Sequence, residues 1–218
     1  MFDKISSSLA NFSFLMFTFC GSVVAQNRFN IDVGVATNYS IYLEDISDVS
    51  SPLAQRGLTP MLNYAFGVKG RFQPDANKSF SIGVSLSELG AKGVDGYFEK
   101  GTYLQIPIEW KNKIGGTVDF LIGISYDFAL QYKYVAEESF FFLETRHFFT
   151  PRIGAGFRSA HGIGFDLSYN YSLQNLYELN FTDMNGQFVG SSSTRFSYIQ
   201  LMISYAIGIG KRAVEPSN

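Results

Sequence analysis

The segment IGFDLSYNY (Ile163–Tyr171) places apolar and polar residues in strict alternation. Successive side chains of a β-strand point to opposite faces of a sheet, so the segment predicts a strand with one apolar and one polar face. Each such segment has about 10 residues, the length that a tilted strand needs to cross a bilayer. Seven other segments alternate in the same way: 29–36, 62–72, 80–87, 104–111, 118–128, 149–158 and 199–208.

The composition excludes several classes of protein. The 218 residues are 46% hydrophobic and 17% aromatic, which excludes a disordered chain. The formal net charge of -2 lacks the basic excess of a nucleic-acid-binding protein. One Cys excludes a disulfide framework and a Cys-based zinc site, and two distant His residues cannot share a metal. We therefore expect no nucleic-acid partner, no metal and no other cofactor.

The N-terminal residues 1–25 predict a cleaved secretory signal peptide. Lys4 supplies positive charge, and Phe12–Val24 is an apolar stretch of about 13 residues, too short to span a bilayer. A membrane anchor is the alternative for this segment. Cleavage before Gln26 divides the chain into a signal peptide (1–25), a barrel (26–210) and a short periplasmic tail (211–218).

The polar faces of the eight segments indicate which solvent the apolar faces meet. These polar faces are mostly Gly, Ser, Ala and Asn, which suit a narrow barrel interior better than a water-exposed surface. Aromatic residues gather near both ends of the apolar face, like the girdles of transmembrane barrels. One set is Phe72, Phe80, Trp110, Phe120, Phe157, Phe165 and Tyr205, and the other is Tyr64, Tyr126, Phe128, Phe149, Tyr169 and Tyr171. This pattern favours a transmembrane barrel over a secreted soluble barrel with an apolar cavity.

The connections between segments alternate in length. The long ones are 41–60, 88–101, 131–146 and 174–195, and the short ones are 73–79, 112–117 and 159–162. Outer-membrane barrels have short periplasmic turns and long extracellular loops. We therefore predict an all-β, eight-stranded antiparallel transmembrane β-barrel in the cell outer membrane. Its expected partners are outer-membrane lipid, lipopolysaccharide and, during biogenesis, the barrel assembly machinery.

Charged residues on the polar face predict a network inside the barrel. They are Lys69, Arg71, Glu109, Lys111, Asp119, Arg158 and Asp166, with Arg152 and Asp127 farther from the periplasmic end as a second pair. Buried charges need partners, and both signs are present. The network predicts salt bridges that close a narrow barrel, and the alternative is a path for protons or ions.

Four segments are similar to those of a known family: YLQIPIEWK (Tyr103–Lys111), Asn63–Gly93, Arg152–Leu173 and Tyr198–Gly208. With them the chain resembles the PorT-like outer-membrane β-barrel family of Bacteroidota. The most specific residues are Tyr103, Leu104, Gln105, Ile106, Pro107 and Ile108. The first strand only approximates the family pattern, and the tail KRAVEPSN lacks a terminal aromatic residue. The resemblance implies an eight-stranded outer-membrane barrel; the namesake acts in type IX protein secretion, a role that a shared barrel does not transfer.

The sequence offers little for catalysis. His147 has Glu144 and Arg146 nearby, but Ser125 fits poorly in depth as its nucleophile, so we predict no enzyme and no catalytic residue. The long loops carry more acidic than basic residues, which favours solubility or cation bridging to lipopolysaccharide. ESFFFLE (Glu138–Glu144) is either a partner-binding patch or a continuation of the adjacent strands.

These features predict a structural or interaction protein that acts through four extracellular loops, with a surface or secretion-system protein as its partner. The alternatives are an accessory component of a type IX-like secretion system, a narrow channel or transporter, and an outer-membrane hydrolase.

Overall fold

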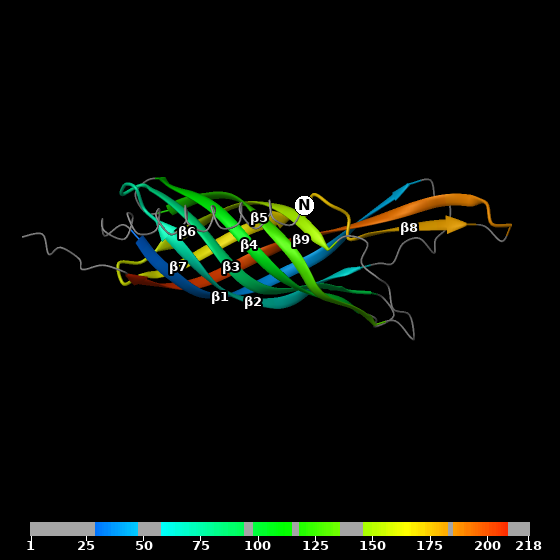
Figure 1. Cartoon of the computed structure of the whole chain (residues 1–218), viewed down its shortest axis with the longest axis horizontal. Coiled ribbons are helices and arrows are strands. Elements are labelled where there is room, and N and C mark those ends of the chain that lie inside the picture. Colours follow the sequence, from blue (N-terminus) through cyan, green and yellow to red (C-terminus); the bar gives the residue numbers. More distant parts are fainter. Residues whose placement is uncertain are drawn as a thin grey trace, which may run out of the picture.

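A computed structural model describes residues 29–47, 58–93, 98–114, 118–135, 146–182 and 185–208 (Figure 1). The predicted signal peptide, its cleavage site, the tail 211–218 and the segment 138–144 lie outside the described residues. In the described part of the chain, no helix is long and apolar enough to cross a membrane.

The described residues form one antiparallel sheet that closes on itself. The strands follow the order β1-β2-β3-β4-β5-β6-β7-β9-β8, and β1 also pairs with β9, so eight strands make the wall and β8 lies outside it. Closure leaves no free edge around the wall, which a lipid environment requires. The strands are β1 (Phe29–Ser47), β2 (Thr59–Phe72), β3 (Lys78–Lys92), β4 (Phe98–Ile114), β5 (Val118–Val135), β6 (His147–Arg158), β7 (Ile163–Tyr171), β8 (Tyr177–Thr182) and β9 (Phe188–Gly208).

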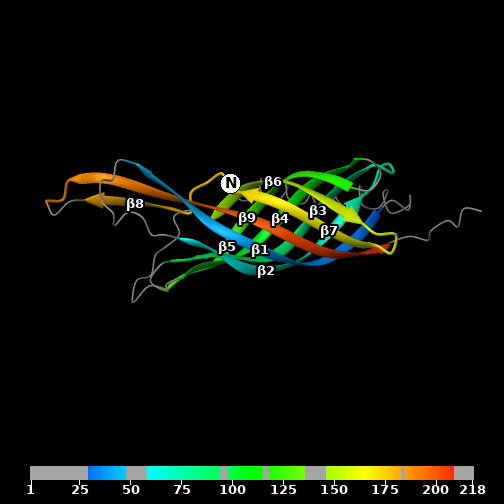
Figure 2. The same ribbon diagram turned by 180° about the vertical axis from the view of Figure 1, so that it is seen from behind.

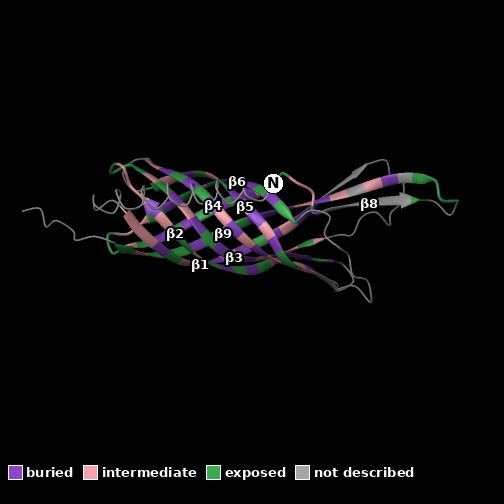
Figure 3. Cartoon of the chain, viewed as in Figure 1, coloured by how far each residue is buried: buried purple, intermediate pink, exposed green. Residues whose placement is uncertain are grey.

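Side chains alternate across the wall in the inside-out sense that the sequence predicted (Figure 3). On β7, Phe165 and Leu167 are exposed on the outside, whereas Asp166 and Ser168 are buried inside. None of the predicted girdle aromatics is buried. Soluble proteins rarely expose so continuous an apolar surface, because its contact with water is unfavourable. The outer face of this wall therefore contacts lipid.

Several strands are much longer than the expected ten or so residues. β1 has 19 residues and β9 has 21, and their pairing continues to Ser47 opposite Ser191. The predicted loop 174–195 is largely strand, because β8 pairs with the first half of β9. β1, β8 and β9 therefore project beyond the barrel as a three-stranded sheet, which we call the strand extension (Figures 1 and 2). Beyond the lipid a strand no longer needs an apolar outer face, so its residues stop alternating. The alternation in the sequence therefore predicted shorter strands than the hydrogen-bonded ladder contains.

Small residues let neighbouring strands approach closely. A Cβ atom at Gly154 of β6 would lie 2.2 Å from the backbone oxygen of Leu167 in β7. Contacts between real Cβ atoms and backbone oxygens are never that short. The glycines of the polar face are thus part of how the barrel stays narrow.

Candidate functional site

The interior next to the short-turn end holds a layer of buried ion pairs. Glu109 of β4 lies between Lys69 of β2 and Arg152 of β6, and its Oε1 is 2.7 Å from the Lys69 Nζ and 2.9 Å from an Arg152 Nη. Ser81 of β3 also donates to Glu109 at 3.3 Å. A buried carboxylate that forms ion pairs with two cations thus links three strands of the barrel across its interior.

A second carboxylate, Asp32 of β1, plays the same part nearer the end of the barrel. Its Oδ2 accepts from the Arg71 Nε at 3.0 Å and from an Arg158 Nη at 2.8 Å. The Lys111 Nζ and the Asp166 Oδ1 form a further pair at 2.5 Å. Asp32 was absent from the predicted network, although its place on the polar face of the first segment was a usable signal.

Asp32 makes the number of carboxylates equal to the number of cations within this set of residues. The nine predicted members comprise five cations and four carboxylates, and Asp32 is the fifth carboxylate. The cations are Lys69, Arg71, Lys111, Arg152 and Arg158, and the carboxylates are Asp32, Glu109, Asp119, Asp127 and Asp166. Eight of them form ion pairs with one another, and we call these eight the ion-pair layer: Asp32, Lys69, Arg71, Glu109, Lys111, Arg152, Arg158 and Asp166.

The expected pair of Arg152 and Asp127 is wrong. Arg152 forms its ion pair with Glu109 and donates to the Gln200 Oε1 at 2.6 Å. Asp127 instead accepts hydrogen bonds from the hydroxyls of Ser125, at 2.5 Å, and Thr150, at 2.8 Å. Strand register decides this, because Asp127 is opposite Phe148 on β6, four positions from Arg152.

The partly buried Asp119 lies at the mouth of the barrel. It lines a hollow of about 220 Å³ together with Arg71, Lys113 and Arg158. In the described residues it forms no ion pair within 4.0 Å, and it lies at the solvent-facing edge of the ion-pair layer.

The opposite end of the interior holds a cluster of large apolar side chains beside the buried Glu99, and the expected polar interior did not include this cluster. Tyr103, Phe148 and Phe196 pack edge to face or tilted, with ring centroids 5.3 to 6.0 Å apart. Their buried companions are Tyr42, Leu89, Ala91, Ala129, Leu176 and Tyr198. We call this cluster the aromatic plug. Phe196 and Tyr198 lie four and two residues before the inward Gln200 on the same strand, so the alternation could have placed them inside the barrel.

The residues of the family-like segment connect these two layers. Tyr103 belongs to the plug, Gln105 donates to the Tyr198 hydroxyl at 2.9 Å, and Glu109 belongs to the ion-pair layer. Leu104, Ile106 and Ile108 alternate with them and lie on the outer face. Pro107 has no backbone N–H to donate, and the β3–β4 register has a gap at Ile106 and Pro107. The segment thus has a structural role inside the barrel.

Little open space remains between the charged side chains. The void among Lys69, Glu109 and Asp166 measures about 10 Å³, roughly the space that one water molecule occupies. An open aqueous path would need a wider barrel or a mobile plug.

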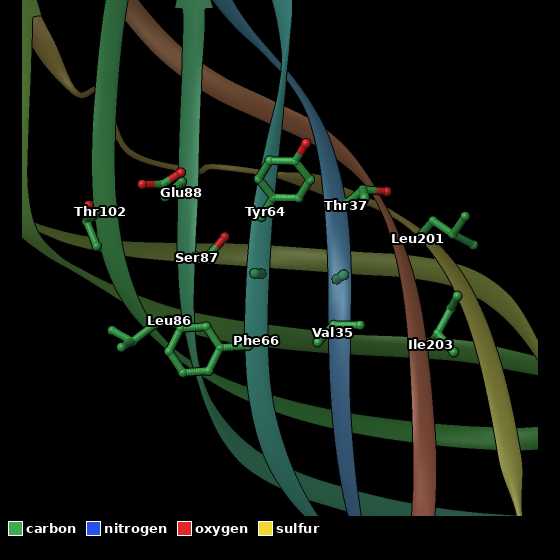
Figure 4. Close-up of a pocket in the computed structure, with 12 residues that line it drawn as sticks. Val35, Thr37, Tyr64, Phe66, Leu86, Ser87, Glu88, Thr102, Leu201 and Ile203 are labelled. Atoms are coloured by element: carbon green, nitrogen blue, oxygen red, sulfur yellow. The ribbon is translucent and has the colours of Figure 1, made fainter.

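The outer wall carries a hollow that the sequence did not predict. It measures about 530 Å³, lies across β9, β1, β2, β3 and β4, and is almost entirely apolar (Figure 4). Tyr64 and Phe66 project from β2, and Leu86, Val35 and Ile203 flank them. We call it the lateral groove. No alternation pattern reveals such a hollow, because it depends on the heights of neighbouring side chains.

The structure separates the two residues weighed for catalysis. Ser125 is buried inside the barrel, whereas His147 is exposed, with its Nδ1 against the Tyr126 hydroxyl. His161 is exposed in the turn between β6 and β7. Among the described residues, no group of three or more His, Cys, Asp or Glu side chains could hold a metal ion.

Comparisons with known proteins agree with this architecture. No protein-family model matches the chain. No curated protein matches it either. Neisserial surface protein A (NspA) has a TM-score of 0.51 at 10% identity, over 80% of this chain and 96% of that one. Ail of Yersinia pestis has a TM-score of 0.47 at 14% identity, over 83% of this chain and 99% of that one. OprG of Pseudomonas aeruginosa has a TM-score of 0.47 at 11% identity, over 83% of this chain and 96% of that one.

The likeness to NspA shows the fold alone. The predicted closed, eight-stranded antiparallel barrel is confirmed by the strand order and by this likeness. Barrels of this kind, with an apolar exterior, reside in bacterial outer membranes, the predicted location.

Proposed function

We propose that this chain is an integral outer-membrane protein that presents β-structure at the cell surface, with a structural or interaction role and no enzymatic activity. The observation that carries the proposal is the strand extension, which rises from a barrel whose interior is filled. A barrel with a filled interior anchors the protein in the membrane, whereas the strand extension lies beyond the lipid and can bind a partner protein.

The strand extension offers backbone groups for binding. Among the described residues, Ile41–Ser47 of β1 pairs with β9 alone, because its pairing with β2 ends at Ser40. β8 also pairs with β9 alone. Within the described residues, each of these two strands therefore has one edge without a neighbouring strand, to which a partner protein could add a strand. The partner is a surface or secretion-system protein, while lipid, lipopolysaccharide and the barrel assembly machinery are the partners of the barrel itself.

Location and orientation are tested by cysteine labelling on intact cells. Gln187→Cys lies in the turn between β8 and β9, and Ala160→Cys lies in the turn between β6 and β7. A membrane-impermeant maleimide should label Gln187→Cys on intact cells and Ala160→Cys only after permeabilisation. The reverse pattern would overturn the orientation, and a soluble fraction without a heat-dependent gel shift would overturn the membrane location.

The resemblance to PorT-like proteins supports a second candidate, an accessory role in a type IX-like secretion system. It rests on the segment Tyr103–Lys111. Deleting the gene and comparing secreted surface proteins tests it, because an accessory component should leave its cargo inside the cell. Unchanged secretion would exclude the role.

Two other candidates have less support. A narrow channel or transporter has to pass both the aromatic plug and the ion-pair layer, and single-channel conductance tests it. A hydrolase lacks a Ser–His contact, since Ser125 and His147 lie on opposite faces of the wall. Unchanged lipid or peptide turnover in His147→Ala would remove it.

A further inference from the structure

The lateral groove lies where the wall of the barrel is irregular. β2 and β3 pair at Pro60 with Ala91 and again at Ala65 with Ser87. Five steps along β2 thus face four steps along β3, and the ladder between these pairs is broken. A bulge of this kind bends the strand and leaves backbone groups without their ladder partners.

Side chains of β1 satisfy those backbone groups from the inside. The Ser40 hydroxyl donates to the Gly90 oxygen at 2.6 Å and accepts from the Gly90 N–H at 2.9 Å. The Asn38 amide donates to the Glu88 oxygen at 3.2 Å. The break in the ladder is therefore stabilised by side-chain hydrogen bonds on the inner side of the wall, and on the outer side it borders the groove.

The outer side forms a groove with high walls and a low floor. Ala36, Ala65 and Ser87, whose side chains are buried, line the floor. The exposed side chains of Tyr64 and Phe66 rise beside it (Figure 4). Its volume of about 530 Å³ is within the range of pockets that hold small ligands, roughly 300–1,000 Å³. Since the groove lies in the lipid-facing wall, its occupant is drawn from the membrane.

One end of the groove is polar. Glu88 lines the groove, and its carboxylate is 2.7 Å from the Nζ of Lys100 on β4. Both side chains are about one-third exposed, at 38% and 32%. Thr102 lies beside them (Figure 4). An apolar trough that ends at one positive and one negative group fits an amphiphile whose headgroup carries both charges.

We propose that the lateral groove binds one acyl chain of a phospholipid with a phosphoethanolamine headgroup. The headgroup phosphate meets the Lys100 ammonium, and the headgroup ammonium meets the Glu88 carboxylate, so each charge has an opposite partner. An anionic headgroup without an amine would pair with Lys100 and leave the Glu88 carboxylate without an opposite charge. The site is independent of the strand extension.

Native mass spectrometry of the protein released from nanodiscs tests the proposal. The nanodiscs contain equal amounts of phosphatidylethanolamine and phosphatidylglycerol. The wild-type protein should retain one phospholipid, with phosphatidylethanolamine enriched several-fold. Thr37→Phe with Thr102→Phe fills the groove and should abolish retention. Ala155→Phe makes the same kind of change on the outer face of β6, across the barrel, and should leave retention intact.

A second variant separates the headgroup from the acyl chain. Glu88→Gln with Lys100→Met should keep one retained phospholipid but lose the preference between the two headgroups. A heat-dependent gel shift shows that each variant is folded. Equal retention in the wild type and the filled variant would overturn the groove as the site. Enrichment of phosphatidylglycerol in the wild type would overturn the assigned headgroup.

Discussion

Replacing Glu109 by Gln should strongly destabilise the barrel. Glu109 is 1% exposed and is the only carboxylate in an ion pair with Lys69 and Arg152 among the described residues. Gln keeps the volume of the side chain, so the loss comes from two buried cations without an opposite charge. Removing one member of a buried ion pair costs about 3–5 kcal/mol of unfolding free energy.

The matched control is Glu88→Gln, which makes the same chemical change in a pair that is about one-third exposed. An ion pair with access to solvent contributes about 0–1 kcal/mol, so this variant should unfold almost like the wild type. Adding Lys69→Met to Glu109→Gln removes one of the two unpaired cations and should recover part of the loss.

Urea unfolding in phospholipid vesicles measures these free energies. Trp110 is the only tryptophan of the chain and lies on β4 beside Glu109, so its fluorescence follows the relevant wall. A Glu109→Gln loss below about 1 kcal/mol, or one equal to that of Glu88→Gln, would refute the reasoning that this carboxylate holds the layer together.

Three further predictions follow from the packing of the interior. Asp32→Asn also leaves two cations unpaired, and the same unfolding assay should show a loss of about 3 kcal/mol or more; a loss below about 1 kcal/mol would contradict it. Gly154→Val forces a Cβ against the Leu167 oxygen and should abolish the heat-dependent gel shift, whereas Ala155→Val should retain it. Phe148→Ala should lose about 3–5 kcal/mol of unfolding free energy yet show no unitary conductance, because the ion-pair layer still closes the barrel; clear conductance steps would show that the plug alone closes it.

The candidate interior could be predicted only in outline. Lys69 and Glu109 were identified as inward residues because a period of two assigns each residue to a face. The sequence did not predict which of these charged residues form ion pairs, because partners such as Arg158 and Asp32 are 126 residues apart in sequence. Their contact depends on how β1 and β6 are staggered around the closed barrel.

The aromatic plug was missed for a different reason. Alternation was interpreted as apolar outside and polar inside along the whole strand. Phe148 and Phe196 break that rule at the end of the barrel, where the interior needs an apolar core of its own. The hydrophobic alternation arises from contact between the outer face and lipid, so it does not predict how side chains pack inside the barrel.

The sequence by itself determined the inside-out barrel and the number of strands in its wall. Both follow from local physics, because strand geometry fixes the face of each residue and the membrane requires that one face be apolar. Only the tertiary structure decided the ion-pair partners, the plug, the strand extension and the lateral groove. Each depends on register between strands or on the relative heights of side chains that are distant in sequence, and no single segment contains that information.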